Sequence, residues 1–229
     1  MTELNEAFKK SVKNGLTSLL KPAGFKVKSA GYFRRKVVNA TQVVHVCYYL
    51  SPRDAVRYKN SGLAFSVELG VHFDFIPSPF DLPVADIPRI TDCQFRTFLR
   101  KTIVQPQFEN GVVWSSVSAL ADVDEILNDA KSVLASSGFD WFAATTRPEV
   151  ALLIATSEKE SLMGNGTWGM GNLGSPLRYL YIAFLSRYLG EVDRASEAFE
   201  QLRKVCSKAD LNWNFQRLAQ ALEQTKPAS

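Results

Sequence analysis

The sequence has no uninterrupted apolar stretch of about 18 residues, the length that a membrane-spanning helix needs. Its first residues, MTELNEAFKKSVKNGL, carry Glu3 and Glu6 where a signal peptide would have an apolar core. Only three cysteines occur, Cys47, Cys93 and Cys206, and their odd number and wide spacing argue against a disulfide framework. These absences predict a soluble, cytoplasmic protein with no membrane partner.

Local signatures of several enzyme classes are also missing. The 229 residues contain no His-Glu-x-x-His, no Cys-x-x-Cys and no Gly-x-Ser-x-Gly, which are the signals of zinc proteases, thiol redox proteins and α/β-hydrolases. The chain has only two histidines, His45 and His72. We therefore predict no cofactor and leave open whether the protein is an enzyme.

Glycine is concentrated in LMGNGTWGMGNLGSP, residues 162–176, where the spacing Gly-x-Gly-x-x-Gly occurs twice. A dinucleotide-binding loop needs a strand directly before it. Here the pattern Thr146-x-x-Glu149, with Pro148 in the first turn, predicts a helix over residues 147–160. A phosphate-binding P-loop would need a lysine directly after its last glycine, and no lysine stands at that position here. The stretch therefore predicts a hinge between two helices and no nucleotide enzyme.

Three large apolar residues lie among these glycines: Met163, Trp168 and Met170. One interpretation is that they fold over the core. The other is that they form an adaptable contact that becomes ordered on a protein partner, since methionine and tryptophan suit such surfaces. A hinge of this composition has few contacts of its own unless Trp168 inserts into a pocket.

Positive charge is concentrated in the first quarter of the chain. Residues 1–61 carry twelve Lys/Arg against three Asp/Glu, although the net charge of the whole chain is only +4. The segment GYFRRK interleaves aromatic and basic side chains, as single-stranded nucleic-acid binders do, but in a sheet every second one of them faces the core. We predict that nucleic acid is not the partner, and weak binding through this hairpin stays an alternative.

Alternating and helical patterns divide the chain in two. Residues 4–20 have a helical apolar stripe that ends at Pro22 and Gly24. Extended segments follow in FKVKSAGYFRRKVV, TQVVHVCYYLSP and GLAFSVELGVHFDF, with shorter ones in CQFRTFLRK and GVVWSSV. The cleanest alternation, Phe65 to Phe75, predicts an antiparallel sheet covered on one side. The fold class is therefore α+β, with a sheet of about four or five strands packed on helices.

Helical patterns dominate the second half of the chain. Asp122-x-x-Glu125 begins one helix, and Gly138 lies where its C-terminal cap is expected. A helical hairpin of tetratricopeptide type follows with its turn at Gly190, and a last helix starts from Asp210. We predict an α+β domain over residues 1–146 and a helical C-terminal region over residues 147–229 that docks on it.

The order of these segments resembles a known family. A helix leads into GFK, then a hairpin ending YFRRK, a strand VVHVCYYLSP, a strand ending ELGVHF, and DVDEILNDAKSVLASSGFDWF. This order is similar to DUF4304, a bacterial family of unknown function, over roughly residues 5–145. The resemblance implies the fold and brings no activity with it. Members often have Asn and Gln near the positions of His45 and Cys47, so it implies no shared site there.

Chemically versatile side chains occur on two of the predicted strands. His45 shares a strand face with Cys47, and His72 shares one with Glu68 and Asp74. If the strands pair, these five form the richest set of ligand-type residues, fit for a transition metal or a Cys–His nucleophile pair. The other interpretation is a solvated outer face of the sheet.

The sequence as a whole favours binding over catalysis. We predict a non-catalytic protein-binding or accessory module, of the kind that neutralises another protein in an immunity-like role. Its candidate binding residues are Met163, Trp168 and Met170. The alternative is a metal-assisted hydrolase at His45, Cys47, Glu68 and His72, with Asp74 as a further ligand.

Overall fold

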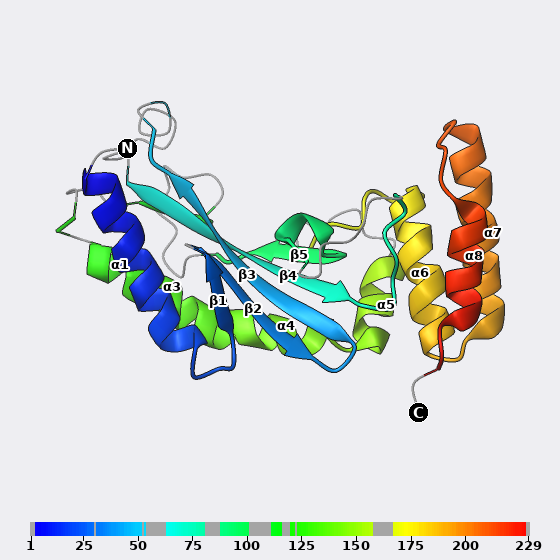
Figure 1. The fold of residues 1–229 in the computed structure, drawn as a ribbon, viewed down its shortest axis with the longest axis horizontal. Coiled ribbons are helices and arrows are strands. Elements are labelled where there is room, and N and C mark those ends of the chain that lie inside the picture. Colours follow the sequence, from blue (N-terminus) through cyan, green and yellow to red (C-terminus); the bar gives the residue numbers. More distant parts are fainter. Residues whose placement is uncertain are drawn as a thin grey trace. The chain divides into compact units, whose positions relative to one another are not determined.

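The fold is α+β, as predicted, with an antiparallel sheet (Figure 1). The computed structural model describes residues 3–29, 31–51, 53, 63–80, 88–100, 111–115, 120–121, 123–157 and 167–227. Its strands are β1 (Lys26–Ser29), β2 (Tyr32–Val37), β3 (Ala40–Tyr49), β4 (Ala64–Phe73), β5 (Phe95–Phe98) and β6 (Val113–Ser115). They follow the order β1-β2-β3-β4-β5, and β6 pairs antiparallel with β4.

The helices also follow the predicted order. They are α1 (Glu3–Leu20), α3 (Val123–Val133), α4 (Phe139–Thr145), α5 (Pro148–Thr156), α6 (Pro176–Tyr188), α7 (Val192–Lys208) and α8 (Phe215–Gln224). A 3-10 turn, η1 (Ile90–Asp92), precedes β5, and a π-helical turn, η2 (Leu134–Gly138), joins α3 to α4. No helix in the part of the chain that the structure describes is both long and apolar enough to cross a membrane.

Compact packing divides the chain into two units. The first unit contains residues 1–36, 42–70 and 97–142, and the second contains residues 37–41, 71–96 and 143–229. Strands β2, β3, β4 and β5 contribute residues to both units, because each unit takes one end of these strands. The domain boundary at residues 146/147 and the docking of the C-terminal region stay predictions.

In the first unit, helix α1 buries its apolar stripe against the sheet. Phe8, Val12, Leu16 and Leu20 are fully buried, and the ring of Phe8 lies 6.2 Å from that of Phe65 on β4. The helix ends as predicted, with Gly24 in the left-handed region at φ +86°. Helices α1 and α3 lie side by side (Figure 1).

Strand β4 is buried on both of its faces. All ten of its residues are buried, the polar Ser66, Glu68 and His72 included. The prediction of a sheet covered on one side is therefore wrong at this strand. The physical reason is its central position, where longer side chains of a neighbouring strand cover it. For example, the hydroxyl of Tyr49 on β3 lies 3.0 Å from that of Ser66.

The predicted helix end at Gly138 is also wrong. The chain continues through the π-helical turn η2 into α4. A Cβ at Gly138 would lie 2.9 Å from Leu134 Cδ1 and 3.2 Å from Leu99 Cδ2. Glycine is needed here because two packed side chains approach its backbone closely, not because a helix ends.

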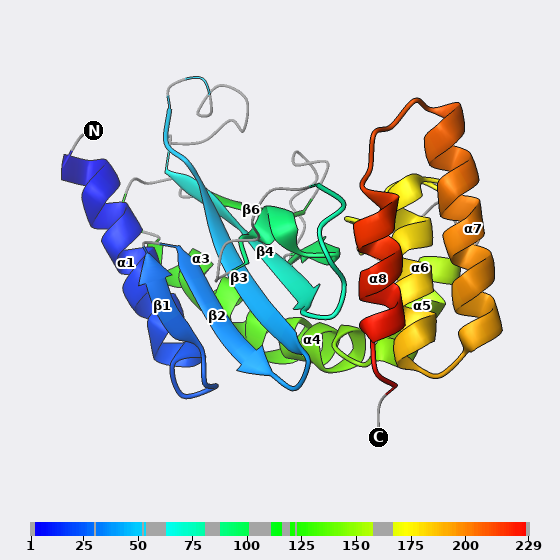
Figure 2. The ribbon, with the colours of Figure 1, turned by 45° about the vertical axis from the view of Figure 1, so that its right-hand side comes forward.

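In the second unit, α6 and α7 form the predicted helical hairpin, with α8 beside α6 (Figure 2). Gly190 makes the turn at φ +81°, and the small Ala183 and Ala195 are buried. Ser175 is the N-cap of α6, since its side chain accepts a hydrogen bond from the backbone N–H of Arg178 at 3.3 Å. The last helix starts at Phe215, five residues later than predicted.

Candidate functional site

The described part of the glycine-rich stretch, residues 167–175, is attached to strand β5. Trp168 and Arg96 form an antiparallel bridge in which both N–H···O distances are 2.7 Å. Gly169 has φ +106°, and a Cβ there would lie only 2.8 Å from the carbonyl oxygen of Gln94. The prediction of a hinge with few contacts of its own is therefore wrong for this part of the stretch.

The three predicted binding residues have different positions. Met163 lies outside the described residues, as do the first two glycines of the stretch. Met170 is 1% exposed, so its side chain belongs to the core. Trp168 is partly buried, and the guanidinium of Arg96 lies over its ring, 3.8 Å from the centroid. Trp168 is thus the predicted binding residue that remains accessible to a partner in the described part of the chain.

The second unit has two hollows that lie next to each other. Both are lined by Arg96, Gly169 and Leu177. The histidine hollow has a volume of about 530 Å³ and is also lined by His72, Phe80, Arg89, Asp92 and Tyr181. The tryptophan hollow has a volume of about 660 Å³ and is also lined by Thr167, Trp168, Met170, Leu173 and Arg178. Aromatic rings and guanidinium groups therefore line both hollows.

Arg178 is a buried cation in the wall of the tryptophan hollow. It is only 4% exposed, and burial lowers the pKa of its guanidinium. Its Nη1 donates a long hydrogen bond of 3.4 Å to the carbonyl of Ser157, and its Nε has no hydrogen-bond partner among the residues that the structure describes. Within the described residues no carboxylate pairs with it. A buried guanidinium of this kind is costly unless an anion compensates its charge.

His72 lines the histidine hollow and is held in place by polar neighbours. Its Nδ1 lies 2.9 Å from the carbonyl oxygen of Asp92 and 3.3 Å from Nε2 of Gln94. The amide of Gln94 is oriented by the N–H of Phe73, which donates to Oε1 at 2.7 Å. A carbonyl oxygen can only accept, so the shorter contact indicates that Nδ1 carries a proton and donates a hydrogen bond to the carbonyl of Asp92.

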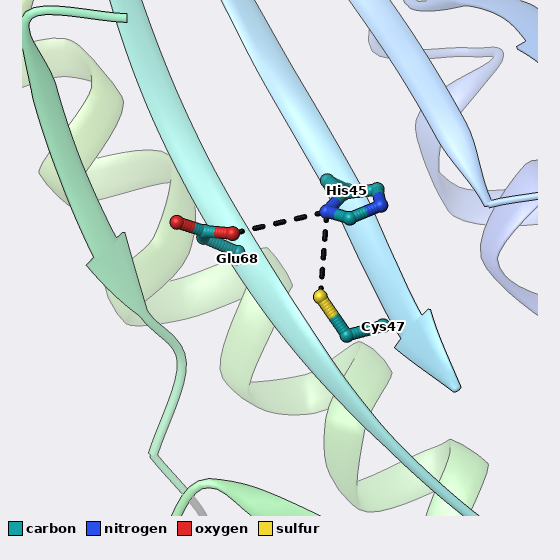
Figure 3. Close-up of side chains that lie close together, drawn as sticks. All are labelled: His45, Cys47 and Glu68. Carbon is teal, nitrogen blue, oxygen red and sulfur yellow. Dashed lines mark hydrogen bonds and ion pairs between the residues drawn. The ribbon is translucent and has the colours of Figure 1, made fainter. Parts of the chain in front are cut away.

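A second group of polar side chains lies on the sheet in the first unit. His45 and Cys47 project from β3, and Glu68 projects toward them from the neighbouring β4 (Figure 3). Nδ1 of His45 lies 3.3 Å from Sγ of Cys47 and 3.8 Å from Oε2 of Glu68. The His45 side chain is 26% exposed and that of Glu68 is 7% exposed. The group is therefore shielded, not a solvated outer face.

The electrostatic state of His45 follows from these neighbours. Burial acts to lower the pKa of His45, but Cys47 and Glu68 outweigh it through hydrogen bonding and charge. Together they raise the pKa from the ordinary 6.5 to about 9. Without a metal, the imidazole is therefore protonated at neutral pH and compensates the charge of the buried carboxylate. The ring of Tyr32 lies against that of His45 at 4.5 Å between centroids.

The geometry of the group suits ligand binding better than proton relay. In a nucleophile–histidine–acid relay, the nucleophile and the acid contact different nitrogens of the imidazole. Here the sulfur of Cys47 and the carboxylate of Glu68 both approach Nδ1 of His45. The three donor atoms lie within 4.8 Å of one another, so they face a common point as metal ligands do.

The structure brings together three of the five predicted ligand residues. His45, Cys47 and Glu68 form one group. His72 belongs to the second unit, where its Nδ1 contacts the backbone of Asp92. Asp74 is exposed beyond the end of β4. Strand alternation indicated which residues share a face. It did not show that His72 and Asp74 lie further along the chain, away from His45 on β3.

The basic hairpin uses its side chains within the fold. Phe33 is fully buried. The guanidinium of Arg35 donates to Gln42 at 2.8 Å and to the carbonyl of Ala23 at 2.7 Å, and lies over the ring of Phe25 at 4.7 Å. This arrangement gives no support to nucleic-acid binding, which stays an unfavoured prediction.

Arg96 and Arg178 are functional candidates that the sequence patterns did not predict. A signal for Arg178 was present, since it lies three residues before Tyr181 and seven before Leu185 on the apolar stripe of α6. A charged residue at a stripe position predicts either a buried partner or a ligand. Arg96 carried no such signal, because its role depends on the bridge to Trp168, a contact distant in sequence.

Comparison with known families identifies the first part of the chain. A family model described as domain of unknown function DUF4304 matches residues 16–144. The chain therefore belongs to this family, and the resemblance predicted from the segment order is confirmed. No curated protein and no solved structure matches the chain. The matched span contains His45, Cys47, Glu68 and Arg96, and it ends before Trp168 and Arg178.

Proposed function

We propose that this DUF4304 protein is a non-catalytic accessory module, immunity-like in type, that binds an acidic segment of a partner protein in the tryptophan hollow. The observation that carries the proposal is Arg178. It is a buried guanidinium in the wall of the hollow, and no carboxylate of the described residues compensates it.

Charge complementarity determines the chemistry of the partner. An ionised group removed from water costs several kcal/mol unless an opposite charge and hydrogen bonds replace the water. A carboxylate inserted into the hollow would accept from Arg178, whose Nε has no partner in the described part of the chain. Guanidinium groups bind carboxylates through two parallel hydrogen bonds, which fixes orientation as well as charge.

The rest of the wall favours a protein over a small anion. Trp168 is stacked under Arg96, and Leu173 is 42% exposed. Tryptophan and arginine are enriched among the residues that dominate protein–protein binding energy. An isolated small anion would satisfy Arg178 but leave these apolar surfaces in water. A peptide segment would cover them.

Site-specific photo-crosslinking tests the proposal. A photoreactive amino acid replaces Leu173, in the wall of the hollow, in the full chain expressed in its native cells. The control replaces Leu153, which is 68% exposed on α5 and does not line the hollow. We expect a specific protein adduct from position 173 that is lost with Arg178→Met and retained with Arg187→Met on the same helix.

Two results would contradict this assignment. One is an adduct that also forms from position 153 or that persists with Arg178→Met. The other is a saturable thermal shift with acetate, succinate or inorganic phosphate in the absence of any adduct, because a ligand that binds the folded state raises the melting temperature. That outcome would assign the hollow to a small anion.

Hydrolysis and nucleic-acid binding stay predictions. The shared contact of Cys47 and Glu68 with one imidazole nitrogen offers no nucleophile relay, and the arginines described in the basic hairpin contact their own fold. Neither function is favoured by an observation as specific as the buried charge of Arg178.

A further inference from the structure

We infer that His45, Cys47 and Glu68 form a binding site for a zinc-class divalent cation. The inference is independent of the proposed partner binding, since it concerns other residues in the other unit. It rests on three donor atoms of three different kinds, an imidazole nitrogen, a sulfur and a carboxylate oxygen, that lie within 4.8 Å of one another.

Regular strand geometry places these donors. Side chains two residues apart on a strand project from the same face, so His45 and Cys47 of β3 lie on one side of the sheet. Glu68 is on the neighbouring strand β4, whose backbone lies about 4.8 Å away in a sheet. The close-up shows the three side chains directed toward one another (Figure 3). The site is therefore held by two sheet strands and requires no loop to close over it.

The distances are close to those of a tetrahedral ion. Bond lengths of about 2.0–2.3 Å to zinc place neighbouring ligand atoms roughly 3.3–3.6 Å apart. The observed separations are 3.3 Å from Nδ1 of His45 to Sγ of Cys47 and 3.8 Å from the same nitrogen to Oε2 of Glu68. Small rotations of the side chains of Cys47 and Glu68 suffice to bring all three atoms onto one ion.

The donor set selects the class of ion. A thiolate and an imidazole favour borderline and soft cations such as zinc and disfavour calcium and magnesium, which prefer oxygen ligands. A divalent ion also compensates the carboxylate of Glu68, which is 7% exposed and would be costly to bury as an uncompensated charge.

Three protein ligands leave one tetrahedral position for water or another ligand. Structural zinc sites are usually closed by four protein ligands, whereas sites with three keep a position open. The ring of Tyr32 packs on His45 with 4.5 Å between centroids and holds the imidazole in place. The His45 side chain is 26% exposed and Cys47 is also partly exposed, so the group can be reached from solvent.

Metal titration of the tag-free, chelator-treated full chain tests the inference. We expect one equivalent of Zn²⁺ by calorimetry, and with Co²⁺ the charge-transfer absorption that signals a cobalt–thiolate bond. Cys47→Ser, which preserves the size of the side chain, should abolish this band. His45→Ala and Glu68→Gln should each weaken Zn²⁺ binding by more than about 100-fold, beyond the roughly 10–100-fold that loss of an outer-shell contact costs.

The other cysteines provide the matched control. Cys206→Ala removes a buried thiol of α7 and should leave the cobalt band unchanged. Circular dichroism of each variant establishes that it is folded. The inference is overturned if the parent protein binds no Zn²⁺ stoichiometrically. It is equally overturned if the band persists in folded Cys47→Ser or disappears in folded Cys206→Ala.

Discussion

The group of His45, Cys47 and Glu68 and the tryptophan hollow both hold ionisable side chains away from water, but they balance charge in opposite ways. In the first, the donor atoms of an imidazole, a thiol and a carboxylate lie within 4.8 Å of one another. In the second, Nε of the buried Arg178 guanidinium has no hydrogen-bond partner in the described part of the chain. The first arrangement suits a cation, and the second suits an anion.

The two sites also differ in the way they are built. The His45 group depends on two long strands, whose alternation fixes which side chains share a face. The tryptophan hollow depends on residues 167–175, which contact β5 through one backbone bridge and contain glycines at positive φ. A buried charge by itself therefore does not indicate which ligand binds. The side chains around the charge indicate it, and the backbone that positions them determines how sensitive the arrangement is to mutation.

Gly169→Ala should have the largest effect on stability. It should also displace the segment that lines the tryptophan hollow. The new Cβ would sit 2.8 Å from the carbonyl oxygen of Gln94, at a backbone φ of +106°. Strain at positive φ and the steric clash together predict a loss of about 2–4 kcal/mol in the free energy of unfolding. Urea denaturation measures it.

Gly174→Ala is the matched control. Its φ is also positive, at +75°, but an added Cβ would meet nothing within 4 Å. We expect a loss of about 1 kcal/mol from the backbone conformation alone. Equal losses in the two variants would show that the attachment of Gly169 to β5 adds nothing to stability, and the contrast between the two sites would fail.

Trp168→Ala should have an intermediate effect. The ring is partly buried and stacked on the guanidinium of Arg96, so the variant loses a cation–π contact and some buried area. We expect a loss of about 1–2 kcal/mol by urea denaturation. A loss of more than about 3 kcal/mol, as for a core tryptophan, would make the ring purely structural and remove it from the binding surface.

Arg178→Met should have little effect on stability, although the residue is 4% exposed. Methionine preserves the apolar contacts of the side chain and removes a charge that has no acidic partner among the described residues. We expect the free energy of unfolding to stay within about 1 kcal/mol of the parent, because replacing a poorly compensated buried charge is often neutral or favourable. A loss of about 3–5 kcal/mol, typical of a broken buried ion pair, would show that the protein itself neutralises Arg178.

The sequence indicated the closeness of His45, Cys47 and Glu68, but it did not indicate the hollow. His45, Cys47 and Glu68 could be grouped because a period of two assigns each to a face, and adjacent strands in an antiparallel meander usually pair. His72 and Asp74 were wrongly placed beside His45. Which residues of two paired strands lie opposite each other depends on register, and alternation alone does not determine the register.

The hollow could not be derived from local patterns. Its walls come from β5, the glycine-rich segment and α6, and they meet through the bridge between Arg96 and Trp168, which is 72 residues away along the chain. The errors at β4 and at Gly138 have the same origin. In each case, side chains distant in sequence cover or approach a residue whose local pattern predicts a solvated face or a helix end.

The smallest expected effect is a change in the pKa of His45 in the metal-free protein. Nuclear magnetic resonance in the presence of a chelator should give a pKa of about 9. Cys47→Ala should lower this pKa more than Glu68→Gln does, because Cys47 makes the larger of the two contributions that raise it. An unchanged pKa in both variants would mean that neither side chain interacts with the imidazole, and the charge balance inferred for this group would be wrong.

The same proton makes stability depend on pH in a defined direction. The pKa of His45 is higher in the folded state, about 9, than the ordinary 6.5 expected on unfolding, so the folded state binds the proton more tightly. This contribution to stability is fully present below about pH 6.5 and is lost as the pH rises through about 9. Urea denaturation at pH 6 and pH 9.5, compared between the parent and Cys47→Ala, isolates it. The parent should lose more stability over this interval, and an equal loss in both proteins would show that Cys47 does not contribute to the raised pKa of His45.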